Sequence, residues 1–268
     1  MKYSPIVSVL IAGLFASSCS TQKQASINAS SSLVSNGKLW SSLFQQRAAE
    51  YKALCFQAYN IARLRLDQRL QDAPLRPLAI VTDIDETVLD NSPNAVHQAL
   101  QGKDYEPQAW YSWTSKASAD TLAGSASFFK YAASRGVEVF YITNRDEKER
   151  ESTLANLRKF NFPFTDNHHL LLKETSSSKE SRRVQVLKSH EIVLLLGDNL
   201  SDFSELFDKL SENNREDITR QQSGNFGNKF IVLPNATYGD WENAIFKYNY
   251  RLTPAEKENI IRKILKNE

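Results

Sequence analysis

The chain has 268 residues, of which 41% are hydrophobic and 24% are charged, and its formal net charge is +2. These values are typical of a globular protein with one sizeable core. A charge so close to neutral gives no electrostatic reason to expect a polymeric nucleic acid as partner, so we expect a small soluble molecule instead.

The first residues predict a secretory signal peptide over 1–18. Lys2 precedes an apolar stretch, Ile6 to Phe15, that is too short to cross a bilayer as a helix but suits the hydrophobic part of a signal. Small residues then lead to Cys19, and this arrangement resembles a bacterial lipobox. The alternative is a plain signal peptide followed by an incidental cysteine.

Lipidation of Cys19 would anchor the mature chain to a membrane. Residues 19–37 are rich in Ser, Asn, Gln and Ala and offer little to bury, so we expect a flexible tether there. The only other cysteine is Cys55, which would leave no intrachain disulfide in the mature protein. We therefore predict a lipid-anchored protein of the cell envelope, at the bacterial outer membrane.

The pattern of apolar residues further along the chain predicts an alternation of helices and strands. Apolar side chains recur at helical spacing over 39–70, and the apolar run Leu78 to Val81 predicts a buried strand that ends at Asp83. Further strands are expected at 137–142, 169–172, 192–196 and 230–233, and helices at 125–135, 147–160, 179–188 and 254–266. This order predicts an α/β fold, a Rossmann-like, doubly wound parallel sheet with its site at the carboxyl ends of the strands.

We expect a single domain over residues 38–268. A small, mainly helical cap is expected to cover the sheet, built from three segments at about 38–72, 90–123 and 254–266.

Two acidic pairs follow predicted strands. Asp83 and Asp85 come after the first strand, and Asp198 and Asp202 come after the strand at 192–196. Carboxylates in such places are costly to bury unless they are used. Parallel strands bring these ends together, and a cluster of Asp83 and Asp198, with Asp202 as a further candidate, fits Mg²⁺. No zinc site competes with it, because His168 and His169 lack partners at ligand spacing, and both are expected at the surface.

A hydroxyl group and a basic group are expected beside the acidic pairs. Thr143 follows the strand at 137–142, and a lysine lies in the segment 173–183. A hydroxyl and a cation are what a transferring phosphoryl group needs. Together with the acids, they predict a phosphoryl-transfer site.

Four segments carry a resemblance to a known family: DIDET (83–87), ITNR (142–145), SSKESRR (177–183) and GDNLSDF (197–203). They resemble the four motifs of the haloacid dehalogenase (HAD) superfamily, and more narrowly those of the bacterial class C acid phosphatases. The likeness covers almost the whole mature chain, including AWYSWT (109–114) and FIVLPNATYGDWE (230–242).

The resemblance implies a Mg²⁺-dependent acid phosphatase that works through an aspartyl-phosphate. Asp83 would be the nucleophile, and Asp85 would protonate the leaving oxygen and later activate water. Asp83, the backbone carbonyl of Asp85, and Asp198 would bind the metal, with Asp202 in support.

The resemblance also implies which groups hold the substrate's phosphate. Thr143 and Lys179 would contact the phosphate oxygens. Lys173 is the alternative to Lys179, because the spacing in this stretch is loose and Arg182 and Arg183 stand nearby.

Aromatic residues in predicted loops suggest what the leaving group is. Trp110 and Tyr238 can stack a nucleobase or a nicotinamide ring, or they can simply pack the cap onto the core. Related enzymes often accept nucleoside monophosphates and some act on nicotinamide mononucleotide, so the resemblance implies a 5′-nucleotidase. Members of the family usually carry Tyr where this chain has Asn94, a departure that concerns substrate fit and not reaction type.

Two other functions are alternatives to this one. A dehalogenase needs neither an acid at Asp85 nor Mg²⁺. A surface lipoprotein that binds haem, a nucleotide or host matrix on a phosphatase fold would gain nothing from four clustered carboxylates, whose mutual repulsion destabilises the fold. Related phosphatases are often dimeric, so the resemblance is consistent with a homodimer.

Overall fold

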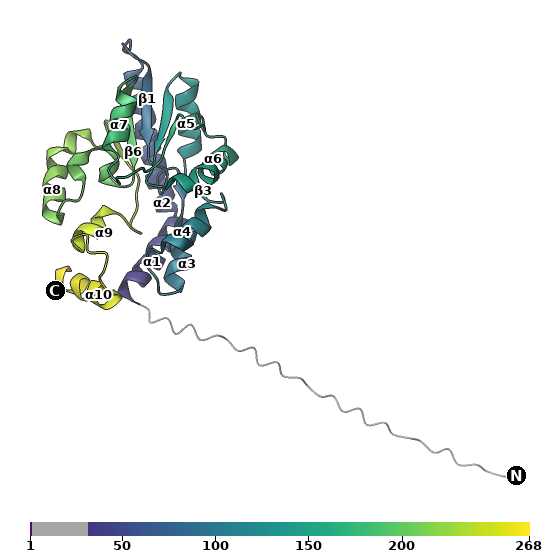
Figure 1. Ribbon diagram of the computed structural model, residues 1–268, viewed down its shortest axis with the longest axis vertical. Helices are drawn as coiled ribbons and strands as arrows, with labels where there is room; N and C mark the ends of the chain where they lie inside the picture. The colour runs from purple at the N-terminus through teal and green to yellow at the C-terminus, as the bar shows by residue number, and fades with distance from the viewer. Residues whose placement is uncertain (2–31) are drawn as a thin grey trace.

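The computed structural model describes residue 1 and residues 32–268 (Figure 1). Its core is a five-stranded parallel sheet in the order β5-β4-β1-β6-β7. The strands are β1 (Leu78–Thr82), β4 (Glu138–Ile142), β5 (Leu170–Leu171), β6 (Glu191–Gly197) and β7 (Phe230–Val232). The order runs outward from β1 in both directions, so the predicted doubly wound α/β fold is confirmed.

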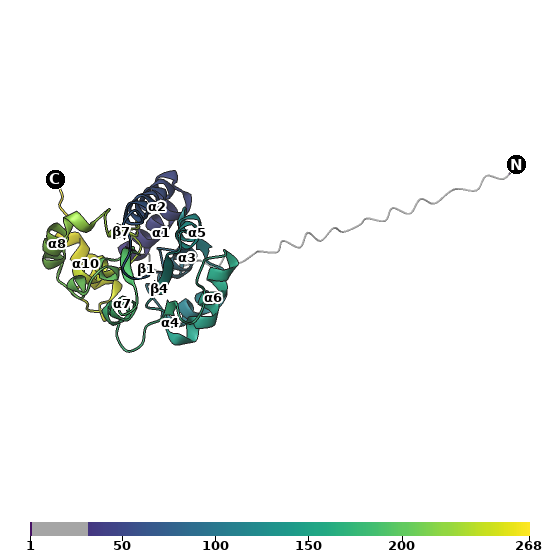
Figure 2. The ribbon, with the colours of Figure 1, turned by 90° about the horizontal axis from the view of Figure 1, so that it is seen from above.

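Helices cover both faces of the sheet. The helices α2 (Ala49–Arg69), α5 (Ser125–Ser134) and α6 (Arg150–Lys159) pack on one face and α7 (Glu180–Leu187) on the other. Because side chains alternate along a strand, Leu78 and Ile80 of β1 join the first layer, whereas Ala79 and Val81 join the second beside Val186. Figure 2 shows α2 and α7 on opposite sides of the sheet.

Most of the remaining elements gather beyond the carboxyl ends of the strands. They are α1 (Leu33–Arg47), α3 (Ser92–Leu100), α4 (Pro107–Thr114), α9 (Asp240–Ile245) and α10 (Pro254–Ile264), with the antiparallel pair β2 (Leu89–Asp90) and β3 (Asp120–Thr121). Also present are α8 (Glu212–Gln221) and the short 3₁₀ helices η1 (Glu147–Glu149), η2 (Leu200–Asp202), η3 (Glu205–Phe207) and η4 (Ser223–Asn225). Helix α1 lies against α3 and α10 (Figure 1), and these helices form the cap.

The structure corrects three expectations about the boundaries. The segment assigned to the tether is helical over 33–37, because Ser32 caps the start of α1 at Leu33. Extended backbone at Ala48 separates α1 from α2, and α2 packs on the sheet, so it belongs to the core and not to the cap. Strand β1 ends at Thr82, one residue earlier than expected.

The histidine pair also differs from the expectation. His168 is exposed, but His169 is buried, and its ring lies between the carboxylates of Asp166 and Glu138. His190 contacts the same Glu138 carboxylate. The two carboxylates give each ring nitrogen of His169 a hydrogen-bond partner, which offsets the free-energy cost of burying the ring.

The predicted signal peptide and the lipidation at Cys19 lie outside the described residues and stay predictions from the sequence. Within the described part of the chain, every helix is too short or too polar to cross a lipid bilayer.

A half-buried ion-pair cluster joins the separate pieces of the cap. The Asp104 carboxylate contacts the ammonium of Lys38 on α1 and lies 2.5 Å from that of Lys257 on α10. Lys38 also lies 3.5 Å from Glu242 on α9. Burial raises the pKa of Asp104, but Lys38 and Lys257 outweigh it and hold that pKa at about 2.

We expect Asp104→Asn to lower the free energy of unfolding at pH 7 by about 1 kcal/mol, a modest value because a third of the side chain is exposed and screened. The folded pKa lies below the unfolded value of about 3.9, so this stabilisation is present above pH 4 and disappears as the pH falls towards 2. Urea unfolding of both proteins between pH 7 and pH 2.5 measures it. If the difference in free energy of unfolding between the two proteins does not shrink as the pH falls, the prediction is contradicted. Asp72→Asn, at an exposed position, is the matched control.

Candidate active site

The ends of β1 and β6 meet at the floor of a cavity. The backbone N–H of Asp83 donates to the carbonyl of Leu196 at 2.9 Å, which sets Asp83 beside Gly197 and Asp198 at the end of β6. The cavity has a volume of about 420 Å³ and extends from these acids to the cap helices. The cavity lies at the point where the strand order reverses. Doubly wound sheets bind their ligands at this point.

A tight turn after β1 sets the direction of the first acidic pair. Val88 N–H donates to the Ile84 carbonyl at 2.8 Å, and Glu86 has a left-handed φ of 55°. The turn buries the Glu86 carboxyl group and leaves Asp83 and Asp85 lining the cavity. Burial raises the pKa of Glu86 well above its usual value, and the charges of Asp85 and Asp198 add to the rise.

Three predicted site residues come together as one cluster. Asp83, Asp198 and Asp202 each offer a carboxylate oxygen, and these oxygens lie within 4.8 Å of one another. Burial raises the pKa of Asp83 to about 7 despite the neighbouring Lys179, and burial together with repulsion from Asp202 and Asp83 raises the pKa of Asp198 well above its usual value. Closely spaced, desolvated carboxylates of this kind are the donor set that a hard divalent cation requires.

Gly197 allows the Asp202 side chain to pack against the end of β6 and so to join the acidic cluster. A Cβ at this position would overlap the side chain of Asp202. Asp202 itself is held by the backbone N–H of Asn199, which donates to its Oδ2 at 3.0 Å. Only a glycine therefore permits the short 3₁₀ turn that returns Asp202 to the end of β6.

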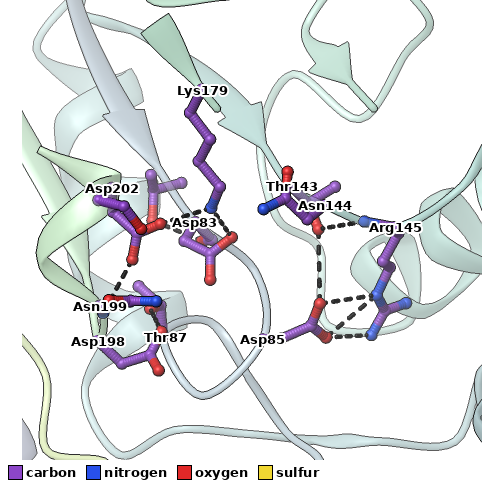
Figure 3. Close-up of polar contacts among 12 residues, drawn as sticks. Asp83, Asp85, Thr87, Thr143, Asn144, Arg145, Lys179, Asp198, Asn199 and Asp202 are labelled. Atoms are coloured by element: carbon purple, nitrogen blue, oxygen red, sulfur yellow. Dashed lines mark hydrogen bonds and ion pairs between the residues drawn. The ribbon is translucent and has the colours of Figure 1, made fainter. Parts of the chain in front are cut away.

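Lys179 supplies a positive charge directly to this cluster (Figure 3). Its buried ammonium contacts the Asp83 carboxylate and lies 2.6 Å from Oδ1 of Asp202. Lys173 instead pairs with Asp146 at 2.6 Å. Of the two lysines considered from the sequence, Lys179 is the one beside Asp83.

The Asp85 side chain lies apart from the cluster and faces Arg145 (Figure 3). Arg145 donates to Asp85 through Nε and Nη2, the latter at 2.7 Å, and Asn91 Nδ2 donates at 2.8 Å. Thr143 Oγ1 donates more weakly at 3.4 Å. The side chain of Asp85 is thus not among the clustered ligands, and its expected contribution to metal binding rests on its backbone carbonyl.

Three arginines in the motif segments have structural tasks that the sequence reasoning missed. Arg145 is 2% exposed and fixes Asp85. Arg182 donates to the Thr143 carbonyl at 2.5 Å and to Asn144 Oδ1 at 2.8 Å, and Arg183 donates to the Asp202 carbonyl at 2.9 Å. The three arginines are visible in the segments ITNR and SSKESRR, but the sequence does not show which loop each guanidinium contacts.

Asn235 was not singled out from the sequence either. It orients the carboxylate of Asp198, which follows the end of β6. Its Nδ2 donates to Asp198 Oδ2 at 2.8 Å, and Thr87 Oγ1 donates to Oδ1 at 3.3 Å. The two contacts leave the Asp198 carboxylate fixed beside Asp83.

Both aromatic residues singled out from the sequence line the cavity. Trp110 lies on α4 and not in a loop as expected, with its Nε1 donating to Glu149 at 3.0 Å. Tyr238 lies in the loop before α9, and its hydroxyl contacts the buried Glu86 carboxyl group. The polar end of each ring is therefore fixed to the core, and both residues form part of the cavity wall.

The fold and the site define a doubly wound α/β protein with an acidic, lysine-bearing cluster at the switch point of its sheet. The family model of the HAD superfamily, subfamily IIIB (acid phosphatase), matches residues 11–241. The chain belongs to this family, as the motifs in its sequence led us to expect.

Two solved structures of the class C acid phosphatase from Bacillus anthracis, one of them with tungstate bound, are similar to this chain. Each has 42% sequence identity and a TM-score of 0.85, and the match covers 88% of this chain and 99% of the other. Acid phosphatase 1 of Solanum lycopersicum is 28% identical over 130 residues. This match covers 46% of the present chain, which spans about half the length of that curated relative.

We expect Mg²⁺ to raise the Tm of the metal-free protein, because a cation relieves the repulsion among the clustered carboxylates. At about 100 times its Kd, a ligand stabilises the folded state by about 2.7 kcal/mol, or on the order of 5 °C for a chain of this size. Asp198→Asn should lose most of this shift, whereas the exposed Asp217→Asn should keep it. Thermal scans after chelation, with and without Mg²⁺, measure both. Equal shifts in the two variants would reject the site.

Proposed function

We propose that this protein is a Mg²⁺-dependent acid phosphatase that hydrolyses phosphomonoesters through an aspartyl-phosphate on Asp83. The observation that carries the proposal is the position of Asp83, which lines the cavity as part of the acidic cluster and contacts the Lys179 ammonium. Tungstate is a tetrahedral oxyanion like phosphate, so its presence in the Bacillus anthracis relative supports a phosphate group as the ligand that proteins of this kind bind.

In the first half of the reaction, an oxygen of the Asp83 carboxylate attacks phosphorus and the bond from phosphorus to the leaving oxygen breaks. Protonated Asp85 gives its proton to that oxygen. In the second half, Asp85 takes a proton from water, whose oxygen attacks the phosphoryl group on Asp83 and releases inorganic phosphate. Arg145 and Asn91 hold Asp85 in one orientation for both transfers.

Charge decides whether a phosphate dianion can enter. Near the floor, the carboxyl groups of Asp83, Asp198 and Asp202 gather around the ammonium of Lys179. A cation bound by these three carboxylates would supply the positive charge that the phosphate oxygens need. Lys179 adds a second positive charge, and the buried Thr143 hydroxyl, which donates to Asp85 at 3.4 Å in this structure, is the expected donor to a phosphate oxygen.

We expect Asp83→Asn to lower kcat by roughly 10⁴-fold or more, because an amide cannot act as the nucleophile. Asp85→Asn should lose about 10²–10⁴-fold, the usual contribution of a general acid and base. Hydrolysis of p-nitrophenyl phosphate with Mg²⁺ at mildly acidic pH measures both, and circular dichroism checks the fold. The exposed Asp120→Asn should retain wild-type turnover. Substantial turnover by a folded Asp83→Asn protein would refute the nucleophile assignment.

We further propose that the preferred substrates are nucleoside monophosphates, which makes the protein a 5′-nucleotidase. A cavity of about 420 Å³ is within the usual range for small-molecule sites, and Trp110 and Tyr238 are among the residues that line it. A surface lipoprotein that only binds haem, a nucleotide or host matrix is not favoured, because the chain belongs to a phosphatase family and retains the full set of acids.

If the two rings stack the base, the purified protein should prefer a nucleoside monophosphate over glycerol phosphate by roughly tenfold to a hundredfold in kcat/KM. Tyr238→Ala and Trp110→Ala should each lower that ratio, whereas Trp40→Ala, which removes an exposed ring outside the cavity, should not. If the rings only pack the cap, the substitutions affect both substrates alike. A wild-type ratio near one would exclude stacking.

A further inference from the structure

The loop after β7 lies beside the acidic cluster. Gly197 at the end of β6 pairs with Val232 of β7, and the N–H of Leu233 then donates to the Gly197 carbonyl at 2.9 Å. Asp198 follows Gly197 in the chain, and Asn235 follows Leu233 by two residues. The register of the sheet therefore brings a side chain of this loop next to one of the clustered carboxylates.

Asp198 is held in a different way from the other two acids of the cluster. The Lys179 ammonium contacts the carboxylates of Asp83 and Asp202. Asp198 accepts hydrogen bonds from neutral side chains, and Nδ2 of Asn235, at 2.8 Å from its Oδ2, is the closer of two donors. A neutral donor orients a carboxylate without cancelling its charge. Asn235 therefore fixes the direction of Asp198 and leaves its full negative charge to a cation.

Asn235 uses both ends of its amide group. Its Oδ1 accepts from the N–H of Thr237 at 2.7 Å, which closes a tight turn. A backbone N–H only donates and an ionised carboxylate only accepts, so the two partners require a carbonyl oxygen and an NH₂ group on one side chain. An aspartate at this position has no donor for Asp198, and a leucine satisfies neither partner. The amide of asparagine meets both requirements.

The same turn leads into the part of the loop that lines the cavity, which includes Thr237 and Tyr238. The Thr237 hydroxyl lies 3.0 Å from that of Ser41 on α1, and the Tyr238 hydroxyl contacts the Glu86 carboxyl group. The loop is thus fixed at three points: to the acidic cluster through Asn235, to the cap through Thr237, and to the turn after β1 through Tyr238.

We propose that Asn235 is a positioning residue with two tasks: it orients Asp198 for the cation, and it fixes the loop that places Tyr238 in the cavity. Cation binding and leaving-group binding then depend on one side chain. This inference rests on the proposed function, the Mg²⁺-dependent hydrolysis of nucleoside monophosphates, and adds to it a residue outside the four motif segments.

The first experiment measures Mg²⁺ binding to the metal-free protein by isothermal titration calorimetry, without substrate. Asn235→Ser keeps an acceptor for the Thr237 N–H but has no NH₂ group for Asp198. We expect its Kd for Mg²⁺ to rise by roughly tenfold to a hundredfold, the usual effect of removing a group that orients a metal ligand. Asn228→Ser, at an exposed position just before β7, is the matched control and should keep the wild-type Kd.

The second experiment separates the two tasks. Asn235→Leu is similar in size but satisfies neither contact, so it should weaken Mg²⁺ binding and also disturb the loop. We expect it to lower the ratio of kcat/KM for AMP to that for glycerol phosphate, at saturating Mg²⁺, by at least about threefold of the tenfold or more that stacking contributes. Asn235→Ser retains the turn and should keep the wild-type ratio.

An unchanged Kd for Mg²⁺ in a folded Asn235→Ser protein would overturn the role of Asn235, because a residue that only supports the fold alters the Tm and not the Kd. An unchanged substrate ratio in a folded Asn235→Leu protein would overturn the second task. Should the leucine variant not fold, the Kd of the serine variant still decides whether Asn235 positions Asp198. Failure of the proposed function has a different signature. If the wild-type protein binds no Mg²⁺, or hydrolyses AMP no better than glycerol phosphate, that function is rejected, and this inference with it.

Discussion

Repulsion among the buried carboxylates of Asp83, Asp198 and Asp202 is the constraint on which the rest of the site depends. Their oxygens lie within 4.8 Å of one another, and desolvation magnifies the repulsion. Lys179 at the N-cap of α7 provides the compensating charge. The same helix stabilises the two neighbouring loops, through Arg182 on Thr143 and Arg183 on Asp202. Helix α7 therefore positions both the acids and their counter-charge.

The turn after β1 gives two acids of one short motif different surroundings. Asp83 remains at the floor among other carboxylates, whereas Asp85 is turned to Arg145 and Asn91. Pairs of titratable groups in contrasting environments are how one site supports two different roles. The left-handed backbone at Glu86 makes this separation, and the buried Glu86 carboxyl group then holds Tyr238 through its hydroxyl. The turn that bears Asp83 and Asp85 is thus coupled to Tyr238 through one strained residue, Glu86.

The sequence predicted the parallel sheet and the clustered acids because both follow from local patterns: short apolar runs, and acids directly after them. It did not predict which partner a helix packs on. The apolar spacing of α2 was visible, but its place on the sheet depends on α5 and the strands, which are distant in sequence. For Trp110 a signal was available, because Glu106 caps α4 and Pro107 occupies its first turn. The burial of His169 depends on Glu138, and no local pattern announces that pairing.

Asn94 connects the sequence comparison with the shape of the cavity. At the position where the resemblance led us to expect a tyrosine, this chain has an amide, Asn94, that lines the cavity one helical turn before Gln98. An aromatic face stacks any base almost equally, because every base has a π-face. A buried amide instead rejects a ligand that leaves it unpaired. An amide at this position adds a hydrogen-bonding group to the α3 wall where a ring would have added only a stacking surface, so substrate choice in this chain should depend on the edge of the leaving group as well as on its face.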